Sequence, residues 1–262
     1  MKWSDLINPL LMALALLTRL PVIRWLPEKW SNKDQGRSVL WYPFVGVLLA
    51  TLLFLFYSFL PQLISPLVGS VLIVTLWILL TGALHLDGLA DSIDAACAAH
   101  IETEKKDRIL AVFKDPAAGP MAVLGLIVIL LLKVTLLAEL ISNGQRHLLL
   151  LFIIVLALPR TLALLLMMST PYVSPKGLGS IVVSHIPKTA AALVIIAVVA
   201  CLFFITSFSI FLMLILSLGS LLFFWRRFWM LRINGFVGDC VGALIELGEV
   251  MILLIFYMLS VL

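Results

Sequence analysis

Long apolar stretches alternate with short polar segments along this chain of 262 residues. Two of them, Val39–Leu84 and Thr189–Trp225, hold no charged side chain over 46 and 37 residues, whereas about 20 apolar residues cross a bilayer. Apolar residues make up 63% of the chain and charged residues 12%, about half the charged share of soluble proteins. The pattern predicts an all-α polytopic membrane bundle, organised as a single domain over residues 1–262.

The apolar stretches divide into about seven transmembrane helices. They are expected at 39–60, 66–84, 119–141, 147–168, two within 189–225 that turn near 206–209, and 243–262. A shorter apolar stretch at 6–20 barely spans and ends at Arg19 and Pro21, so it predicts an interfacial or re-entrant helix. The remaining polar segments, at 21–37, 85–118, 169–188 and 226–242, are predicted to be loops.

With this order of spans, all four polar segments lie on the same side of the membrane. That side holds 15 of the 18 basic residues, 14 in these loops or at their edges and Lys2 at the N-terminus. Since loops rich in Lys and Arg stay in the cytoplasm, we expect the polar segments to face it. One polar mouth is typical of a membrane enzyme, whereas a transporter would show polar groups at the midplane and an internal repeat.

A cluster of carboxylates opens the segment 85–118. Half of the fourteen acidic residues lie between Asp87 and Asp115. Asp87, Asp91 and Asp94 are spaced i, i+4, i+7, which places them within about 60° on one helix face. Three carboxylates repel one another unless Mg²⁺ or a clamp of Lys and Arg lies between them. The alternative is a solvated acidic helix face, but Gly88 leaves room for a ligand or a helix to approach.

Two cations stand near or within the spans. Lys114 precedes Asp115 at the entry to the span 119–141, where the pair is either ordinary juxtamembrane charge or a phosphate contact beside a base or metal ligand. Arg160 lies inside an apolar span, and such arginines usually face a polar cavity. We therefore expect it to contact an anion. Lys133, in mid-span, is a weaker candidate for the same kind of contact because no motif surrounds it.

Glycine-rich segments follow later in the chain. Lys176-Gly177-Leu178-Gly179 can present backbone N–H groups and a cation to a phosphate. The stretch from Arg232 and Asn234 to Asp239 combines glycines with a carboxylate at a helix start, and Glu246 lies two turns further on. This stretch is either functional or a glycine-rich turn capped by Asp239. The four histidines are dispersed, so a histidine metal site is not expected.

Taken together, these motifs resemble the cobalamin 5′-phosphate synthase family, also called adenosylcobinamide-GDP ribazoletransferases. The central match is Gly82-Ala83-Leu84-His85-Leu86-Asp87-Gly88-Leu89-Ala90-Asp91, continuing to Asp94. The flanking matches, in order, are Leu17-Thr18-Arg19-Leu20-Pro21, Gly36-Arg37-Ser38, Lys114-Asp115, Pro159-Arg160, Gly177-Leu178-Gly179, Gly238–Ala243 and Glu246–Glu249. They cover nearly the whole chain.

The resemblance implies the last assembly step of the cobamide lower ligand. Adenosylcobinamide-GDP and α-ribazole, or its 5′-phosphate, would give adenosylcobalamin, or its 5′-phosphate, and GMP in a bacterial cytoplasmic (inner) membrane. Mg²⁺ would be held by Asp87, Asp91 and Asp94, with Asp115 or Asp239 as the base and Lys114 beside it. The implied substrate-binding residues are His85, Arg19, Arg37, Arg160, Lys176, Gly177, Gly179, Arg232, Asn234 and Glu246. Membrane lipid is an expected partner, nucleic acid is not, and a homo-oligomer stays open.

Two departures from the family pattern and two rival functions accompany this interpretation. Ala117 stands where the family usually has a second cation, and Asn234–Gly238 replaces a more polar loop. A CDP-alcohol phosphotransferase shares the element from Asp87 to Ala90, but the Arg that follows it there is Asp91 here. A cation-coupled transporter would place its carboxylates deep in the spans. The phosphotransferase would differ from the favoured enzyme in its substrate, and the transporter would belong to another functional class.

Overall fold

The computed structural model describes residues 4–26, 30–61, 63–98, 106–144, 147–174 and 178–261, and in these ranges the chain is a bundle of helices without a strand. The helices are α1 Ser4–Leu17, α2 Asn32–Ser38, α3 Tyr42–Phe59, α4 Pro66–Thr81, α5 Leu84–Ala98, α6 Lys106–Val112, α7 Pro120–Ser142, α8 Leu148–Ser169, α9 Leu178–Ser184, α10 Lys188–Ile205, α11 Phe208–Ile233 and α12 Gly238–Val261. The predicted polytopic helical fold is confirmed.

Six helical segments among the described residues are long and apolar enough to cross a membrane. They are the continuous segment Asn32–Phe59, then α7, α8, α10, α11 and α12, and the bent pair α4–α5 makes a seventh if counted as one broken span. The helix α1 is apolar but too short, as expected for an interfacial helix. These segments match the predicted spans.

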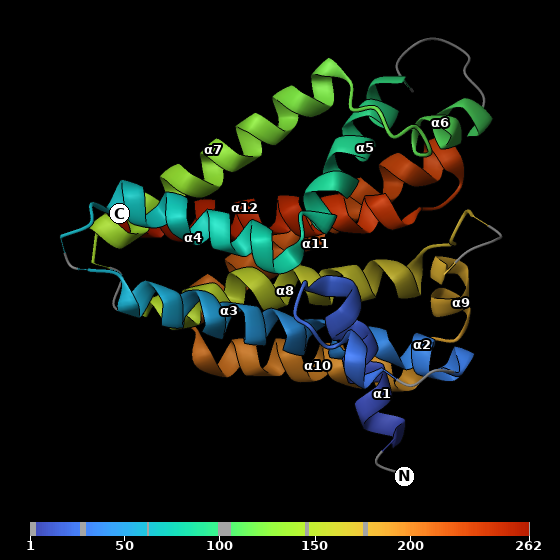
Figure 1. The fold of residues 1–262 in the computed structure, drawn as a ribbon, viewed down its shortest axis with the longest axis horizontal. Helices are drawn as coiled ribbons and strands as arrows, with labels where there is room; N and C mark the ends of the chain where they lie inside the picture. Colours follow the sequence, from blue (N-terminus) through green and yellow to red (C-terminus); the bar gives the residue numbers. More distant parts are fainter. Residues whose placement is uncertain are drawn as a thin grey trace.

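The centre of the bundle is formed by α8 and α12, which pack on each other. Their apolar windows are 78% and 72% buried, whereas those of α10 and α11 are only 11% buried. Around this pair, α3 packs on α8, α4 on α7, and α5 on both α12 and α7. Figure 1 shows α5, α6 and α9 at one end of the bundle, and the α3–α4 connection with the C-terminus at the other. The polar segments therefore gather at one end.

A sharp bend separates α4 from α5. Gly82 and Ala83 both have left-handed backbones, with φ of 63° and 58°, and α5 leaves at 88° to α4. A side chain on Gly82 would collide with that of Arg19, whose backbone N–H donates to Leu80. Glycine suits the left-handed position because it lacks a Cβ. The bend carries the acidic segment away from the apolar helix.

All four predicted loops contain helix, and 85–118 holds nearly all of α5 and the whole of α6. The segment 21–37 includes most of α2, which begins with a capping box between Ser31 and Asp34. The segment 169–188 includes α9, and 226–242 holds the last turns of α11 and the start of α12. The loop prediction was wrong at α2 and α11 because a membrane helix can continue past its apolar part: α11 runs on to Ile233, and Arg226 on it donates hydrogen bonds to Ser169 and Thr170 at the end of α8.

Candidate active site

The candidate site is built where α5 crosses the start of α12. A Cβ on Gly88 would lie 2.8 Å from the carbonyl oxygen of Asp239, and one on Gly242 would lie 3.2 Å from Cα of His85. The two backbones are thus in contact, and larger side chains would separate them. The room that the sequence predicted at Gly88 is taken by a helix, and this contact brings Asp239 to the acidic face of α5.

Four carboxylates share this region. Asp87, Asp91 and Asp94 lie on α5, as predicted, and Asp239 joins them from α12. Burial raises the pKa of Asp91, on a helix outside the six spanning segments, to about 6. The negative charge of Asp239 adds to this shift, followed by those of Asp87 and Asp94. Such mutual repulsion is what a bound cation relieves.

Asp94 also joins α5 to the start of α7. Its two carboxylate oxygens accept hydrogen bonds from the backbone N–H of Gly119 at 2.6 Å and of Ala122 at 3.2 Å. Gly119 is the N-cap of α7, so a negative charge here stabilises the free N–H groups of the helix start. Asp94 thereby fixes the position of α5 against α7.

Among the described residues, no three acidic, histidine or cysteine side chains form a complete metal-ligand set. Mg²⁺ does not require one, because it usually keeps several waters and takes one or two carboxylates plus substrate phosphates. Asp87 is exposed and Asp91 is half-buried, one helical turn apart. Their oxygens have the right chemistry for such an ion.

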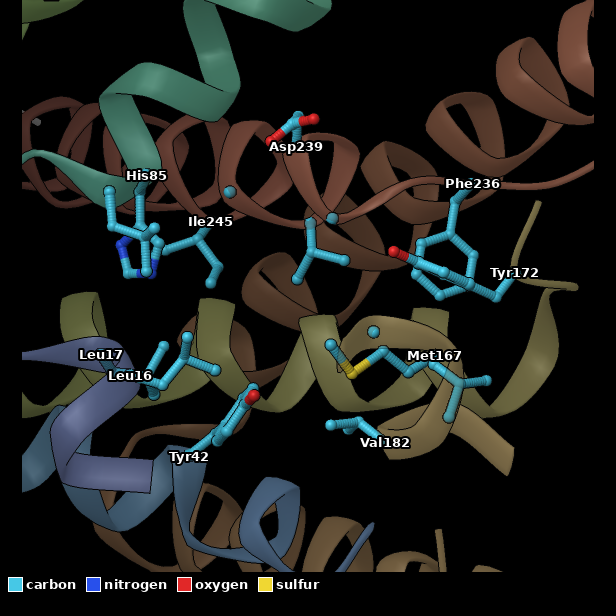
Figure 2. A pocket seen from close by; sticks show the side chains of 16 residues that line it. Leu16, Leu17, Tyr42, His85, Met167, Tyr172, Val182, Phe236, Asp239 and Ile245 are labelled. Carbon is cyan, nitrogen blue, oxygen red and sulfur yellow. The ribbon is translucent and has the colours of Figure 1, made fainter. Parts of the chain in front are cut away.

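A cavity of about 240 Å³ lies beside the carboxylates (Figure 2). Its lining is mainly apolar and comes from α1, α3, α5, α8, α9 and α12 together with the segment before α12. Tyr172 and Phe236 form part of the wall, with ring centroids 5.3 Å apart. They are held by hydrogen bonds of 2.9 and 3.0 Å between the backbones of 171–173 and 236. Asp239 lies at one edge, so it belongs both to the cavity and to the acidic cluster.

His85 lines the same cavity from α5. Its side chain is 3% exposed, and neither ring nitrogen has a hydrogen-bond partner. Burial, with the positive charges of Arg160 and Lys133, lowers the pKa of His85 well below its usual range. An imidazole buried without partners is costly for the fold. It is therefore a candidate ligand contact.

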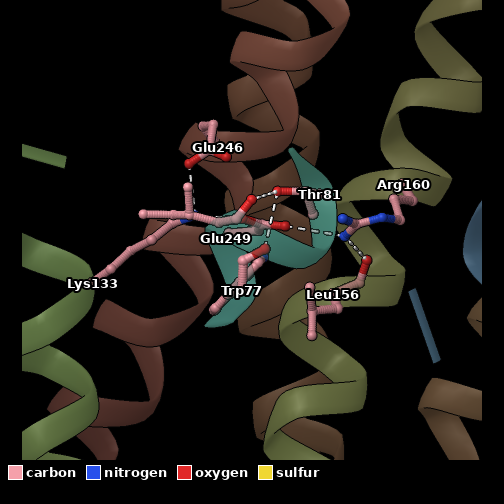
Figure 3. Close-up of polar contacts among 8 residues, drawn as sticks. Trp77, Thr81, Lys133, Leu156, Arg160, Glu246 and Glu249 are labelled. Carbon is pink, nitrogen blue, oxygen red and sulfur yellow. Dashed lines mark hydrogen bonds and ion pairs between the residues drawn. The ribbon is translucent and has the colours of Figure 1, made fainter. Parts of the chain in front are cut away.

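A second polar group lies deeper, in the middle of the bundle (Figure 3). Glu249 on α12 accepts a hydrogen bond from Lys133 on α7 at 2.6 Å and from Arg160 on α8 at 3.1 Å. Lys133 also lies 2.6 Å from Oε2 of Glu246. That contact is an ion pair, since this oxygen has no partner at a hydrogen-bonding angle. We call these four residues the buried charge network.

The network is electrically balanced, with two cations and two carboxylates, and each side chain is nearly or fully buried. Lys133 also stands 4.3 Å from the ring centre of Trp77, which ties α4 to α7, α8 and α12. Deep carboxylates would be typical of a transporter, but Glu246 and Glu249 are both neutralised by protein cations. The anion that Arg160 contacts is Glu249, not a group lining the cavity.

The other predicted site residues lie at the polar end of the bundle or outside the described ranges. Lys114 and Asp115 are exposed between α6 and α7, and Asp115 accepts a hydrogen bond of 3.0 Å from the backbone of Ala117. Arg19 is exposed and Arg37 is half-buried. Lys176 and Gly177 lie outside the described residues.

Each glycine-rich segment contributes described residues to the cavity lining: Gly179 from the first, and Phe236, Gly238 and Asp239 from the second. A Cβ on Gly179 would meet the ring of Tyr172. Asn234 ends α11 in a left-handed backbone with φ of 59°. Arg232 stacks on Phe228 at 3.5 Å and donates to the Phe228 carbonyl at 3.4 Å. The prediction that these residues bind substrate stays a prediction.

Sequence reasoning missed several residues that the structure brings together. Tyr42, Tyr172 and Phe236 in the cavity wall carried no motif. Lys133 was only a weak candidate because no motif surrounds it, and its partner Glu249 is 116 residues away. The available signal was charge balance, since two cations and two carboxylates in apolar spans need partners.

Removing the centre of the buried charge network should destabilise the bundle. We expect Glu249→Ala to cost about 3–5 kcal/mol, because it leaves Lys133 and Arg160 charged, buried and short of a partner. Glu139→Ala, at an exposed site on α7, should change stability by less than about 0.5 kcal/mol. Thermal and denaturant unfolding in the same detergent measures both. Equal midpoints for the two variants would contradict the assigned role of the network.

Comparison with known proteins gives a consistent assignment. The family model described as cobalamin-5-phosphate synthase matches residues 9–257. A protein of Pseudomonas putida named adenosylcobinamide-GDP ribazoletransferase is 41% identical over 94% of this chain and 97% of its own length. Proteins with the same name from Stutzerimonas stutzeri and Pseudomonas fluorescens are 40% identical over 94% of this chain and 96% and 97% of their own.

No solved structure matches the chain. The family match spans all the helices that build the cavity and the acidic cluster, and the similarity to curated relatives extends over nearly the whole sequence. The chain belongs to the cobalamin-5-phosphate synthase family.

Proposed function

We propose that the protein is a Mg²⁺-dependent transferase that joins adenosylcobinamide-GDP to α-ribazole, or α-ribazole 5′-phosphate, and releases GMP. The observation that carries the proposal is that Asp239, at the edge of a mainly apolar cavity, lies beside Asp87 and Asp91. Phosphoryl chemistry needs a hard cation held by carboxylates. The family membership and the shared name of the relatives support the same reaction.

The divalent cation would be held by Asp87 and Asp91, and it supplies charge neutralisation at the pyrophosphate of the donor. Asp94, which the sequence also assigned to the metal, holds the start of α7 and keeps the acidic face of α5 in place. Lys114 and Arg232 are the cations proposed to contact phosphate oxygens. Lys176 stays in this set on sequence grounds alone.

The reaction transfers a phosphoryl centre between two oxygens. The ribose hydroxyl of α-ribazole forms a bond to the phosphorus attached to cobinamide, and the bond from that phosphorus to the bridging oxygen breaks. The bridging oxygen leaves with GMP and carries the electron pair, while a carboxylate takes the hydroxyl proton. Asp239 is favoured as this base because it lies beside Asp91 and the cavity, whereas Asp115 is exposed and engaged with Ala117.

The transferase activity is tested directly by GMP release. Purified protein in nanodiscs, given adenosylcobinamide-GDP, α-ribazole and Mg²⁺, should form GMP and a cobamide in equal amounts. Asp91→Asn should lower the rate at least 100-fold because the metal loses a charged ligand, whereas Asp107→Asn on the nearby exposed helix α6 should keep it. Failure of folded wild-type protein to release GMP would contradict the proposal, and turnover of a CDP-linked donor instead would favour a phosphotransferase acting on lipid.

The assignment of the base predicts a difference between two aspartates. Asp239→Asn should lower kcat at least 100-fold with little change in the KM of the donor, because proton removal is lost. Asp115→Asn should lower kcat by less than about tenfold. The comparison is made at saturating Mg²⁺ with both proteins shown to be folded. A larger loss in Asp115→Asn than in Asp239→Asn would reverse the assignment.

The protein is a multi-pass helical membrane protein, and we propose that it lies in the bacterial inner membrane with its polar end in the cytoplasm. The support is the excess of Lys and Arg on the segments that meet at that end. Both substrates are large and charged, so a cytoplasmic mouth also suits their supply.

Accessibility of introduced cysteines tests this orientation. In a background with the exposed Cys97 and Cys201 replaced by serine, Ser207→Cys at the α10–α11 turn should react with an impermeant maleimide added to spheroplasts. Asp107→Cys on α6 should react only after the membrane is opened. The reverse pattern would place the polar end outside.

A further inference from the structure

The cavity beside α5 and α12 has a mainly apolar lining, which the phosphoryl transfer itself does not require. Apart from His85, Asp239 and the hydroxyl groups of Tyr42 and Tyr172, its lining is apolar or glycine. Figure 2 shows Tyr42 and Tyr172 pointing their hydroxyl groups into the space from different elements. A pocket of this kind binds an uncharged, mostly apolar group and orients it through a few polar contacts.

The size of the cavity limits what enters it. About 240 Å³ accommodates a small two-ring heterocycle but not a corrinoid with its nucleotide. The aromatic wall of Tyr172 and Phe236 offers ring faces and edges to such a heterocycle. The guanine and adenine of the donor have a similar size, but their several amino, carbonyl and ring-nitrogen groups would stay largely unpaired against a lining with four polar side chains. The base of α-ribazole has only a ring nitrogen to satisfy, so it fits this lining better.

His85 indicates that the ligand carries a hydrogen-bonding atom. Its imidazole is buried, lines the cavity and has no hydrogen-bond partner on either nitrogen. An acyl chain of a lipid would leave both nitrogens unpaired, which is unfavourable. A nitrogen heterocycle offers a complementary atom for a hydrogen bond.

The location of the cavity relative to the carboxylates gives the orientation of the ligand. Asp239 lies at the edge of the cavity (Figure 2) and contacts the backbone of α5 at Gly88. A group attached to the buried heterocycle would therefore leave the cavity beside Asp239. In a nucleoside, that group is the ribose.

We propose that this cavity is the binding site for the planar, uncharged heteroaromatic base of the acceptor nucleoside, with His85 as its hydrogen-bond partner and the ribose emerging beside Asp239. The role in turnover rests on the proposed transferase function. Binding of the base by itself does not, because it requires neither the donor nor Mg²⁺.

The binding step is tested with free benzimidazole as the probe. Equilibrium dialysis of the full-length protein in nanodiscs, without donor or Mg²⁺, should show saturable binding that α-ribazole displaces. Val182→Trp, which fills the cavity from the short helix α9, and His85→Phe, which removes both nitrogens, should each weaken binding at least tenfold. The control Ile196→Trp adds the same side chain on α10, where Ile196 is 62% exposed on the outer face, and should bind as wild type does.

Kinetics supply the second readout. Val182→Trp should raise the KM for α-ribazole at least tenfold and change the KM for adenosylcobinamide-GDP less than twofold. Benzimidazole binding without GMP release would contradict the proposed function but support the base-binding site. GMP release with an unchanged α-ribazole KM in Val182→Trp would overturn the base site and leave the function standing. Displacement of bound benzimidazole by short-chain phospholipid but not by α-ribazole would assign the cavity to lipid and also overturn the proposal.

Discussion

The structure depends on the neutralisation of charge inside an apolar bundle. A lone Lys or Arg in a transmembrane helix is costly, and so is a lone Glu. Here Glu249 lies between Lys133 and Arg160, and Glu246 completes a balanced set that joins α7, α8 and α12. Loss of Glu249 would deprive both Lys133 and Arg160 of a partner, so the stability of the set depends on this central residue. They fix the central helices in one arrangement.

The helix that carries the two glutamates also carries Asp239, the proposed base. Asp239 lies at the start of α12, and Glu246 and Glu249 follow about two and three turns later. The close contact of Gly88 and Gly242 then sets α5 against α12. The buried charge network thus determines where Asp239 stands relative to Asp91. Chemistry at the polar end and stability in the middle of the bundle are linked through one rigid element.

Much of this architecture follows from the sequence. Apolar runs far longer than one crossing predict the helices, and the spacing of Asp87, Asp91 and Asp94 predicts their shared helix face. The bend at Gly82 and the contact of α5 with α12 could not be predicted, since they depend on the fit between distant segments: Arg19 lies against Gly82, and Asp239 lies against Gly88. The aromatic wall of the cavity was missed for the same reason: Tyr172 and Phe236 meet only through tertiary contacts.

The central claim is that the α5 carboxylates hold a divalent cation beside the cavity. Electron paramagnetic resonance of Mn²⁺ titrated into the nanodisc-held protein, with adenosylcobinamide-GDP present and no acceptor, tests it most directly. Our account predicts one tightly bound Mn²⁺ per chain, lost when Asp87 and Asp91 are both replaced by asparagine and retained in Asp107→Asn. Unchanged Mn²⁺ binding in the double variant would contradict it.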